Sequence, residues 1–151
     1  EQPLNNLPAT LKSLEIDCYK FEQPLNNLPD NLENLTIKSS FYRHQLSHLP
    51  HNLKSLKIDA YIVHDNIIND LPQSLKTLKI ESSKFNQSLD NLPKGLKHLE
   101  LKCDNLDQPL KRVWRKNLNN ENSEDQPFDN LPKELETLII KTKNVDINNK
   151  F

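Results

Sequence analysis

Leu28-Pro29-Asp30-Asn31-Leu32-Glu33-Asn34-Leu35-Thr36-Ile37 is the stretch that decides the fold, because its pattern returns along the whole chain. The Leu-Pro pair recurs in steps of 21, 21, 22, 21 and 39 residues, and three residues after each proline a Leu-x-x-Leu-x-(Ile or Leu) pattern begins. Its six copies are Leu11/Leu14/Ile16, Leu32/Leu35/Ile37, Leu53/Leu56/Ile58, Leu75/Leu78/Ile80, Leu96/Leu99/Leu101 and Leu135/Leu138/Ile140. A fixed period of this length is typical of proteins built from stacked repeats.

The alternating Leu-x-Ile in each unit predicts a short strand, because successive strand residues point to opposite faces. A proline in every unit excludes long helices. One unit cannot bury its apolar side alone, so neighbouring units must stack and share an interior. The sequence therefore predicts a leucine-rich-repeat-like solenoid of about 21 residues per repeat. We expect a parallel β-sheet on one face and turns, extended segments or short helical turns on the other.

Three further columns of residues follow each strand at fixed spacing, and we expect them to face the interior. The first holds small side chains at the corner of the coil: Cys18, Ser39, Ala60, Ser82, Cys103 and Thr142. The second holds larger apolar ones: Phe21, Tyr42, Val63, Phe85, Leu106 and Val145. The third precedes the next Leu-Pro pair: Leu25, Leu46, Ile68, Leu89 and Leu110.

The spacing predicts a single repeat domain over residues 1–151, with an insertion at about 111–127 that accounts for the 39-residue step. The string at 107–110 is echoed at 125–128, and either copy fits the regular repeat position. Residues 1–8 are identical to residues 22–29, so we expect the chain to be a fragment of a longer array.

Composition excludes several classes of partner and compartment. Lys+Arg 20 against Asp+Glu 21 gives a net charge of -1, so there is no general attraction to nucleic acid or to an acidic membrane. No window approaches the roughly 18 apolar residues of a membrane span. Cys18 and Cys103 lie four units apart, about 19 Å at the usual strand spacing, which predicts two free thiols and a cytoplasmic setting.

Stacking places the outward side chains of successive strands in columns. The first column is Ser13, Asn34, Ser55, Thr77, His98 and Thr137; the second is Glu15, Thr36, Lys57, Lys79, Glu100 and Ile139; the third is Asp17, Lys38, Asp59, Glu81, Lys102 and Lys141. Two interpretations remain open: a solvated face whose charges pair across strands, and a mixed-charge face that recognises a protein. On the second, the candidate partner-binding residues are Glu15, Asp17, Lys38, Lys57, Asp59, Lys79, Glu81, Glu100 and Lys102.

The insertion carries a second candidate binding patch. Leu110, Val113, Trp114 and Leu118 have helical spacing, and we expect a short amphipathic helix followed by an exposed loop. Arg112, Trp114 and Arg115 are candidate partner-binding residues, since they lie in a basic run with the only tryptophan. The alternatives are that Trp114 covers the edge of the coil beside solvated cations, or that the run contacts nucleic acid.

No catalytic residues, cofactor or metal site are expected. His44, His48 and His51 are close in sequence, but they replace ordinary loop residues of the preceding unit and no further ligands complete a metal set. Nucleophile elbows and glycine-rich phosphate loops are absent from the sequence, which has a single glycine. We therefore expect no enzyme.

The strings Phe21-Glu22-Gln23-Pro24-Leu25-Asn26-Asn27-Leu28-Pro29 and Phe85-Asn86-Gln87-Ser88-Leu89 resemble the FNIP repeat, a divergent relative of leucine-rich repeats found in social amoebae and in giant viruses of amoebae. The resemblance covers nearly the whole chain and is looser at 42–46 and 63–68, where the Gln-Pro element is missing. It implies a repeat region that follows an F-box and holds the substrate of a ubiquitin ligase. No F-box occurs in these 151 residues.

The function that follows is a protein-protein interaction module, with the resemblance implying the substrate-binding part of an F-box-type ubiquitin-ligase adaptor. The partner is expected to be a protein, with no nucleic acid and no membrane. The alternative is a structural or surface repeat protein without a specific recognition role.

Overall fold

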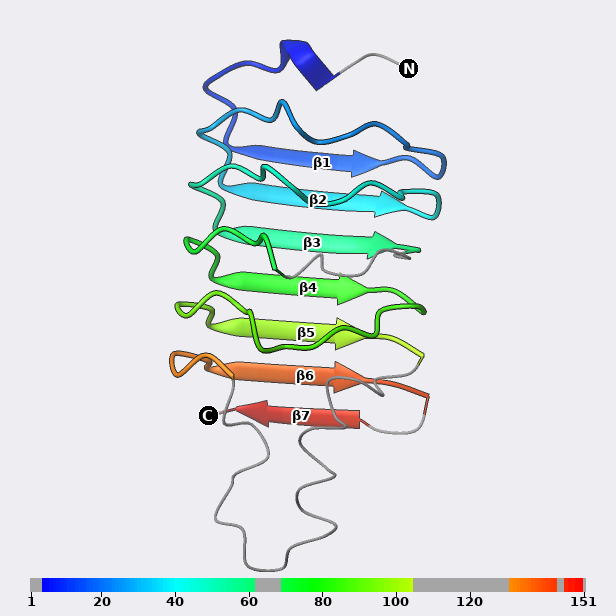
Figure 1. Ribbon diagram of the computed structural model, residues 1–151, viewed down its shortest axis with the longest axis vertical. Helices are drawn as coiled ribbons and strands as arrows, with labels where there is room; N and C mark the ends of the chain where they lie inside the picture. Colours follow the sequence, from blue (N-terminus) through cyan, green and yellow to red (C-terminus); the bar gives the residue numbers. More distant parts are fainter. Residues whose placement is uncertain (1–3, 62–68, 105–130, 144–145, 151) are drawn as a thin grey trace, which may run out of the picture.

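Six short parallel strands recur at the predicted positions in the computed structural model, which describes residues 4–61, 69–104, 131–143 and 146–150. The elements are η1 (Leu4–Asn6), β1 (Ser13–Asp17), β2 (Asn34–Ser39), β3 (Ser55–Ala60), β4 (Thr77–Glu81), β5 (His98–Lys102), β6 (Thr137–Lys141) and β7 (Asp146–Lys150). The strands form one sheet in chain order, with β1 to β6 parallel (Figure 1). The predicted parallel solenoid is confirmed.

The strands stack in the register that the repeat predicts. Within the described part of the chain, Leu14, Leu35, Leu56, Leu78, Leu99 and Leu138 are partners across successive strands. All except Leu14 are at most 1% exposed. Leu14 is half-buried, because β1 has no described strand on its other side. The repeat pattern predicts that all six leucines are buried, and this prediction is wrong at the first strand.

A tight turn before each strand explains the Leu-Pro-x-x-Leu pattern. The carbonyl oxygen of each proline accepts a hydrogen bond from the backbone N–H of the leucine three residues later, as from Leu32 to Pro29 at 3.0 Å and from Leu75 to Pro72 at 3.1 Å. This is the hydrogen bond of a β-turn, in which proline fixes part of the backbone geometry. The same turn starts all six parallel strands, so each enters the sheet at the same height.

The residues that follow each strand close the coil. Phe21, Tyr42 and Phe85 are buried in the interior, as are Leu25 and Leu46. Leu89 is half-buried. Among the described residues the only helical element is the single 3-10 turn η1, so turns and extended segments make the wall opposite the sheet. Val63, Ile68, Leu106, Leu110 and Val145 of these columns lie outside the described residues, as does the insertion at about 111–127.

The small-residue column is buried only in part. Ser39, Ala60, Ser82 and Cys103 are buried, whereas Cys18 is exposed and Thr142 is half-buried. The expectation of an inward column is therefore wrong at Cys18, which lies on the first unit where no described neighbour covers it. Both cysteines are free thiols, as predicted. Burial raises the pKa of the Cys103 thiol to about 11.

The last strand departs from the repeat. β7 pairs antiparallel with β6, with Thr137 opposite Lys150 and Lys141 opposite Asp146. The sequence reading placed no strand here, because Asp146-Ile147-Asn148-Asn149-Lys150 lacks the repeat pattern. An antiparallel strand needs only a short connection to the strand before it. β7 pairs with the backbone N–H and C=O groups at the edge of β6, where a further parallel strand would otherwise lie.

Tyr42 offers a test of the packing inside the coil. Its ring stacks on Phe21 with centroids 5.9 Å apart, but its buried hydroxyl has no hydrogen-bond partner among the described residues. Burial also raises the pKa of this phenol. Because an unsatisfied buried polar group is costly, Tyr42→Phe is expected to stabilise the fold by about 1 kcal/mol. Urea unfolding measures this effect, and a destabilised variant would show that the hydroxyl has a partner.

Candidate protein-binding face

The outward side chains of the sheet form the three predicted columns. In the strand register, the residues of the middle column lie beside each other in the order Glu15, Thr36, Lys57, Lys79, Glu100 and Ile139. The other two columns have the same register. From β1 to β6 the face extends about 24 Å at the usual spacing of strands. A partner on this face would therefore meet side chains from six consecutive units.

Many charges on this face pair with each other across neighbouring strands. Lys38 binds both Glu15 at 2.7 Å and Asp17 at 3.3 Å, and the hydrogen bond to Glu15 is the main cause of its raised pKa. Lys79 lies 3.2 Å from Glu100. The Lys38 pairs are exposed and the Lys79–Glu100 pair is half-buried. Ion pairs that solvent still reaches contribute little to stability, so a partner can replace them at small cost.

Lys102 joins two neighbouring acids on the same face. Its ammonium lies 3.1 Å from Glu81 and 3.8 Å from Glu100. The hydrogen bond to Glu81 is the main cause of its raised pKa. Seven of the nine candidate charges on the face, all except Lys57 and Asp59, thus belong to cross-strand or same-strand ion pairs.

Lys57 and Asp59 on β3 differ from their neighbours. Both are exposed, and neither has an ion pair within the part of the chain that the structure describes. They lie near the middle of the face, with two described strands on the β1 side and four on the β7 side. The centre of the face therefore presents a cation and an anion that form no ion pair with the described residues.

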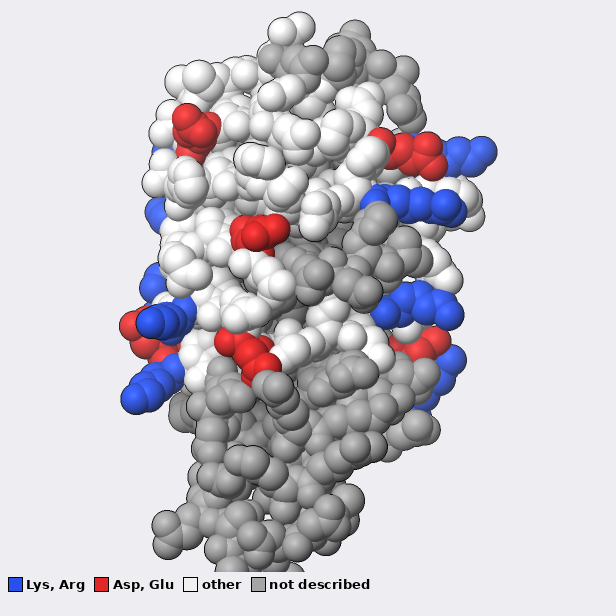
Figure 2. All heavy atoms as spheres, in the orientation of Figure 1, with Lys and Arg blue, Asp and Glu red and all other residues white. Residues whose placement is uncertain are grey.

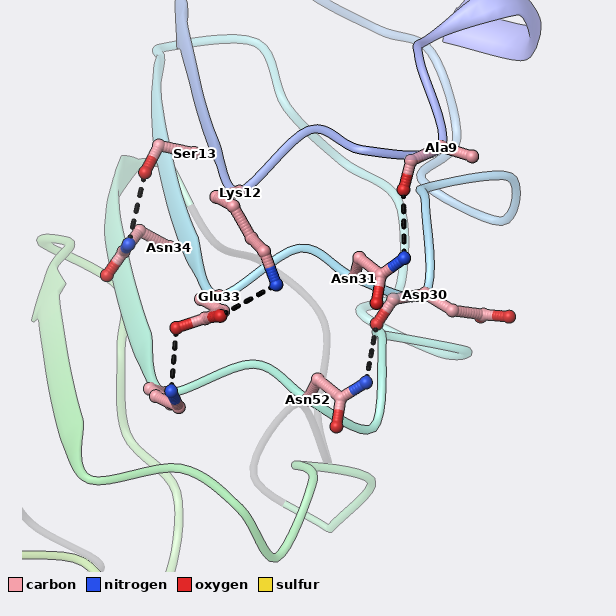
Figure 3. A network of polar contacts seen from close by, with 9 residues as sticks. Ala9, Lys12, Ser13, Asp30, Asn31, Glu33, Asn34 and Asn52 are labelled. Atoms are coloured by element: carbon pink, nitrogen blue, oxygen red, sulfur yellow. Dashed lines mark hydrogen bonds and ion pairs between the residues drawn. The ribbon is translucent and has the colours of Figure 1, made fainter.

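A second polar ladder runs along the amino ends of the strands and has a structural role. Lys12 and Lys54 both bind Glu33, at 2.9 and 2.6 Å, and Asn34 donates to the Ser13 hydroxyl at 3.1 Å (Figure 3). Asn31 and Asn52 each donate to a backbone carbonyl of the preceding unit, those of Ala9 and Asp30 at 3.0 Å. These contacts join one turn of the coil to the next.

The charge of Glu33 makes this ladder sensitive to acid. Hydrogen bonds from Lys54 and then from Lys12 lower the pKa of Glu33 from 4.5 to about 2. Because the folded state has the lower pKa, the ladder stabilises fully above pH 4.5 and loses its contribution as the pH falls through 2.

We therefore expect NMR titration of the Glu33 carboxyl to give a midpoint near 2, and Lys54→Ala to raise that midpoint toward 4.5. Lys57→Ala, which alters an exposed lysine on the sheet face, is the matched control and should leave the midpoint in place. A wild-type midpoint near 4.5 would contradict the ladder.

In Figure 2, most of the charged side chains that can be seen lie along the two sides of the molecule, where the strands of Figure 1 begin and end. In the view of Figure 2, the described part of the surface between these edges carries few of them.

The edge at the carboxyl ends of the strands also carries aromatic side chains that were not predicted from the sequence. Tyr19 is 65% exposed and Tyr61 41% exposed. The rings of Tyr19 and Phe41 meet edge to face at 5.1 Å, and the Arg43 guanidinium lies 6.0 Å from the Phe41 ring centre.

A shallow groove of about 660 Å³ lies along this edge. It is lined by Tyr19, Ser40, Phe41, Arg43, Asp59, Ala60, Tyr61, Glu81, Ser82, Ser83, Lys102, Cys103, Asp104, Lys141, Thr142 and Lys143. A signal for it was present in the sequence: Tyr19 and Tyr61 each stand two residues after the third outward column, so alternation directs both outward. The groove continues the sheet face around its corner.

The remaining sequence candidates fall elsewhere. Arg112, Trp114 and Arg115 lie outside the described residues. His44 contacts the carbonyl oxygen of Glu22, a loop contact of the kind expected. No group of three metal-binding side chains is found in the described ranges. Within those same ranges, no helix has the length and apolar character to cross a membrane.

Parallel strands stacked in one register, with a regular polar face, define a β-solenoid repeat protein. The family model described as FNIP Repeat matches residues 64–104, so this part of the chain has the sequence of an FNIP repeat. This match confirms the resemblance drawn from the sequence and indicates a repeat-type protein-interaction module. No match was found among curated proteins or among solved structures.

Proposed function

We propose that the chain binds a protein partner on the exposed face of its sheet, and that it catalyses no reaction. The observation that carries this proposal is the register of the sheet, which repeats outward side chains at the same height on six strands. An ordered surface of this length suits an extended or gently curved protein surface, the usual ligand of a solenoid. Lys57 and Asp59, which form no ion pair with the described residues, lie near its centre.

The pairing of charges on the face supports recognition by exchange of ion pairs. Lys79 and Glu81 are held by Glu100 and Lys102 before a partner arrives, so their side chains are already ordered near the positions used for binding. Pre-ordered side chains lose less entropy on association than free ones. Mixed charge also gives specificity, since a partner with the wrong pattern meets like charges.

Reversing four charges tests the proposal: Lys57→Glu, Asp59→Lys, Lys79→Glu and Glu81→Lys together. We expect binding of the physiological partner, identified by co-purification with the full-length protein, to be lost in a pull-down. Circular dichroism should stay unchanged, because exposed charges contribute little to stability.

A matched control keeps the same net charge and moves the changes off the face. Asp30→Lys, Asp70→Lys, Lys94→Glu and Lys133→Glu alter four exposed residues in the turns before the strands. This variant is expected to bind like wild type. Undiminished binding by the face variant, or equal loss in the control, would refute the assignment of the face.

In its finer form the proposal makes the bound protein the substrate of a ubiquitin ligase, recruited through an F-box-type adaptor segment outside these residues. Only the family resemblance supports this form, and co-purification of ligase subunits with the full-length protein tests it. A cytoplasmic setting is part of the same proposal and is supported by the two free thiols.

A further inference from the structure

We propose that the groove at the carboxyl ends of the strands is the anchor point of this interface, and that it binds an extended peptide segment carrying an aromatic residue and, about four residues away, a carboxylate. The inference rests on the proposed function, because it assigns a particular segment of the bound protein to a particular part of the site. It follows from the shape of the groove and from the unequal chemistry of its two ends.

The shape comes from small side chains at the corner of the coil. Ser40, Ala60, Ser82 and Ser83 line the groove where each strand turns away from the sheet. Because these side chains are short, a hollow of about 660 Å³ runs across the ends of several strands. An extended chain can lie in such a channel, whereas a compact ligand would touch only one end of it.

The end of the groove near β1 to β3 is aromatic. Tyr19, Phe41 and Tyr61 gather there, and the backbone N–H of Phe41 donates to the carbonyl oxygen of Tyr19 at 3.3 Å, which fixes the two rings beside each other. Arg43 lies over the Phe41 ring. Exposed tyrosines and an arginine held in place are the residue types that dominate binding energy at protein interfaces. This end suits an aromatic side chain of the partner.

The opposite end of the groove, at β5 and β6, has more lysines than acidic side chains among the residues that line it. Lys102 is bound to Glu81, and Lys143 is bound to Asp104 at 2.8 Å. Lys141 is exposed and has no ion pair among the described residues. Among the described side chains, the charge left over at this end is therefore positive, and its complement is a carboxylate.

Distance links the two ends. Tyr61 directly follows β3 and Lys141 ends β6, so three strand spacings separate them, about 14 Å. An extended peptide advances about 3.3 Å per residue, so about four residues cover this span. Asp59 lies on β3, two residues before Tyr61, and has no ion pair among the described residues, so it can accept a backbone N–H of the bound segment. The mixed charge along the groove disfavours a nucleic-acid backbone as its occupant.

Selection from a displayed library of random 12-residue peptides tests this proposal. We expect the enriched peptides to carry an aromatic residue and an Asp or Glu about four positions apart. Tyr61→Ala is expected to weaken their binding by about tenfold or more, the loss usual for an interfacial hot spot. Lys141→Glu should change the selected residue from acidic to basic. Lys94→Glu, which changes an exposed lysine in the turn before β5, is the matched control and should select the same peptides as wild type.

The outcomes separate this proposal from the broader function. Enriched peptides that depend on Tyr61 and respond to Lys141→Glu support the groove. Enriched peptides that are indifferent to both changes overturn it, while leaving a binding function intact. A selection that enriches no peptide also overturns the groove proposal. Protein binding by the sheet face is then tested by the four-charge pull-down alone.

Discussion

Replacing Leu56 by alanine is expected to lower the free energy of unfolding by about 2 to 5 kcal/mol, the usual cost of a cavity at a buried leucine. Leu56 is 0% exposed and lies between Leu35 and Leu78 in the register of the sheet. The repeats on both sides are held by their own neighbours, so the interior cannot collapse into the space that the side chain leaves. Denaturant unfolding followed by circular dichroism measures the change.

Lys57→Ala is the matched control, since it alters the next residue on the same strand but on the solvent face. It is expected to change the free energy of unfolding by no more than about 0.5 kcal/mol. If the two variants had the same stability, the assignment of inward and outward faces would be wrong.

Phe85→Ala is expected to cost about 3 to 5 kcal/mol, the range for a buried aromatic residue. Phe85 is 1% exposed, and its backbone N–H donates to the carbonyl oxygen of Ser82 at 3.1 Å. The residue lies outside the strands, so this variant tests the opposite wall of the coil. The exposed neighbour Lys84 provides the control through Lys84→Ala. A negligible effect at Phe85 would mean that only the strands are packed.

The strands, their order and their register could be predicted because every repeat contains the residue pattern of a turn followed by a strand. The Leu-Pro turn, the two leucines and a final isoleucine or leucine recur in each unit, so six copies support one assignment. The outward columns followed from the same register. In this part of the molecule, local pattern and tertiary packing agree, as expected of a well-encoded fold.

Features that depend on position in the stack could not be read from a single unit. Leu14 and Cys18 have the same sequence context as their buried counterparts, yet each is more exposed because β1 is the first strand. β7 pairs with the edge of β6, and its sequence lacks the repeat pattern, so the periodicity did not predict this strand. End effects of this kind are a property of the assembled coil.

The candidate site could be predicted in its residues but not in its pairings. The sequence placed Glu81 and Lys102 in one column, whereas the 3.1 Å bond between them depends on side-chain conformations. The groove was missed because its aromatic residues do not form one column: Tyr19 and Tyr61 share a repeat position that holds Ser40 in the unit between them, and Phe41 occupies the next position. Only the folded corner brings the three together.

Equivalent residues of successive repeats lie side by side, each separated from the next by the distance between neighbouring strands. Spin labels at Glu15 paired with a second label at Lys79, Glu100 or Ile139 test it by electron spin resonance, in a Cys18→Ser, Cys103→Ala background that copies the residues of other units at that position. The three pairs are separated by three, four and five strand steps, so the account predicts backbone separations of about 14, 19 and 24 Å that rise by one spacing each time. Separations that do not rise in equal steps along this series would contradict the stacked solenoid, and with it the binding face built upon it.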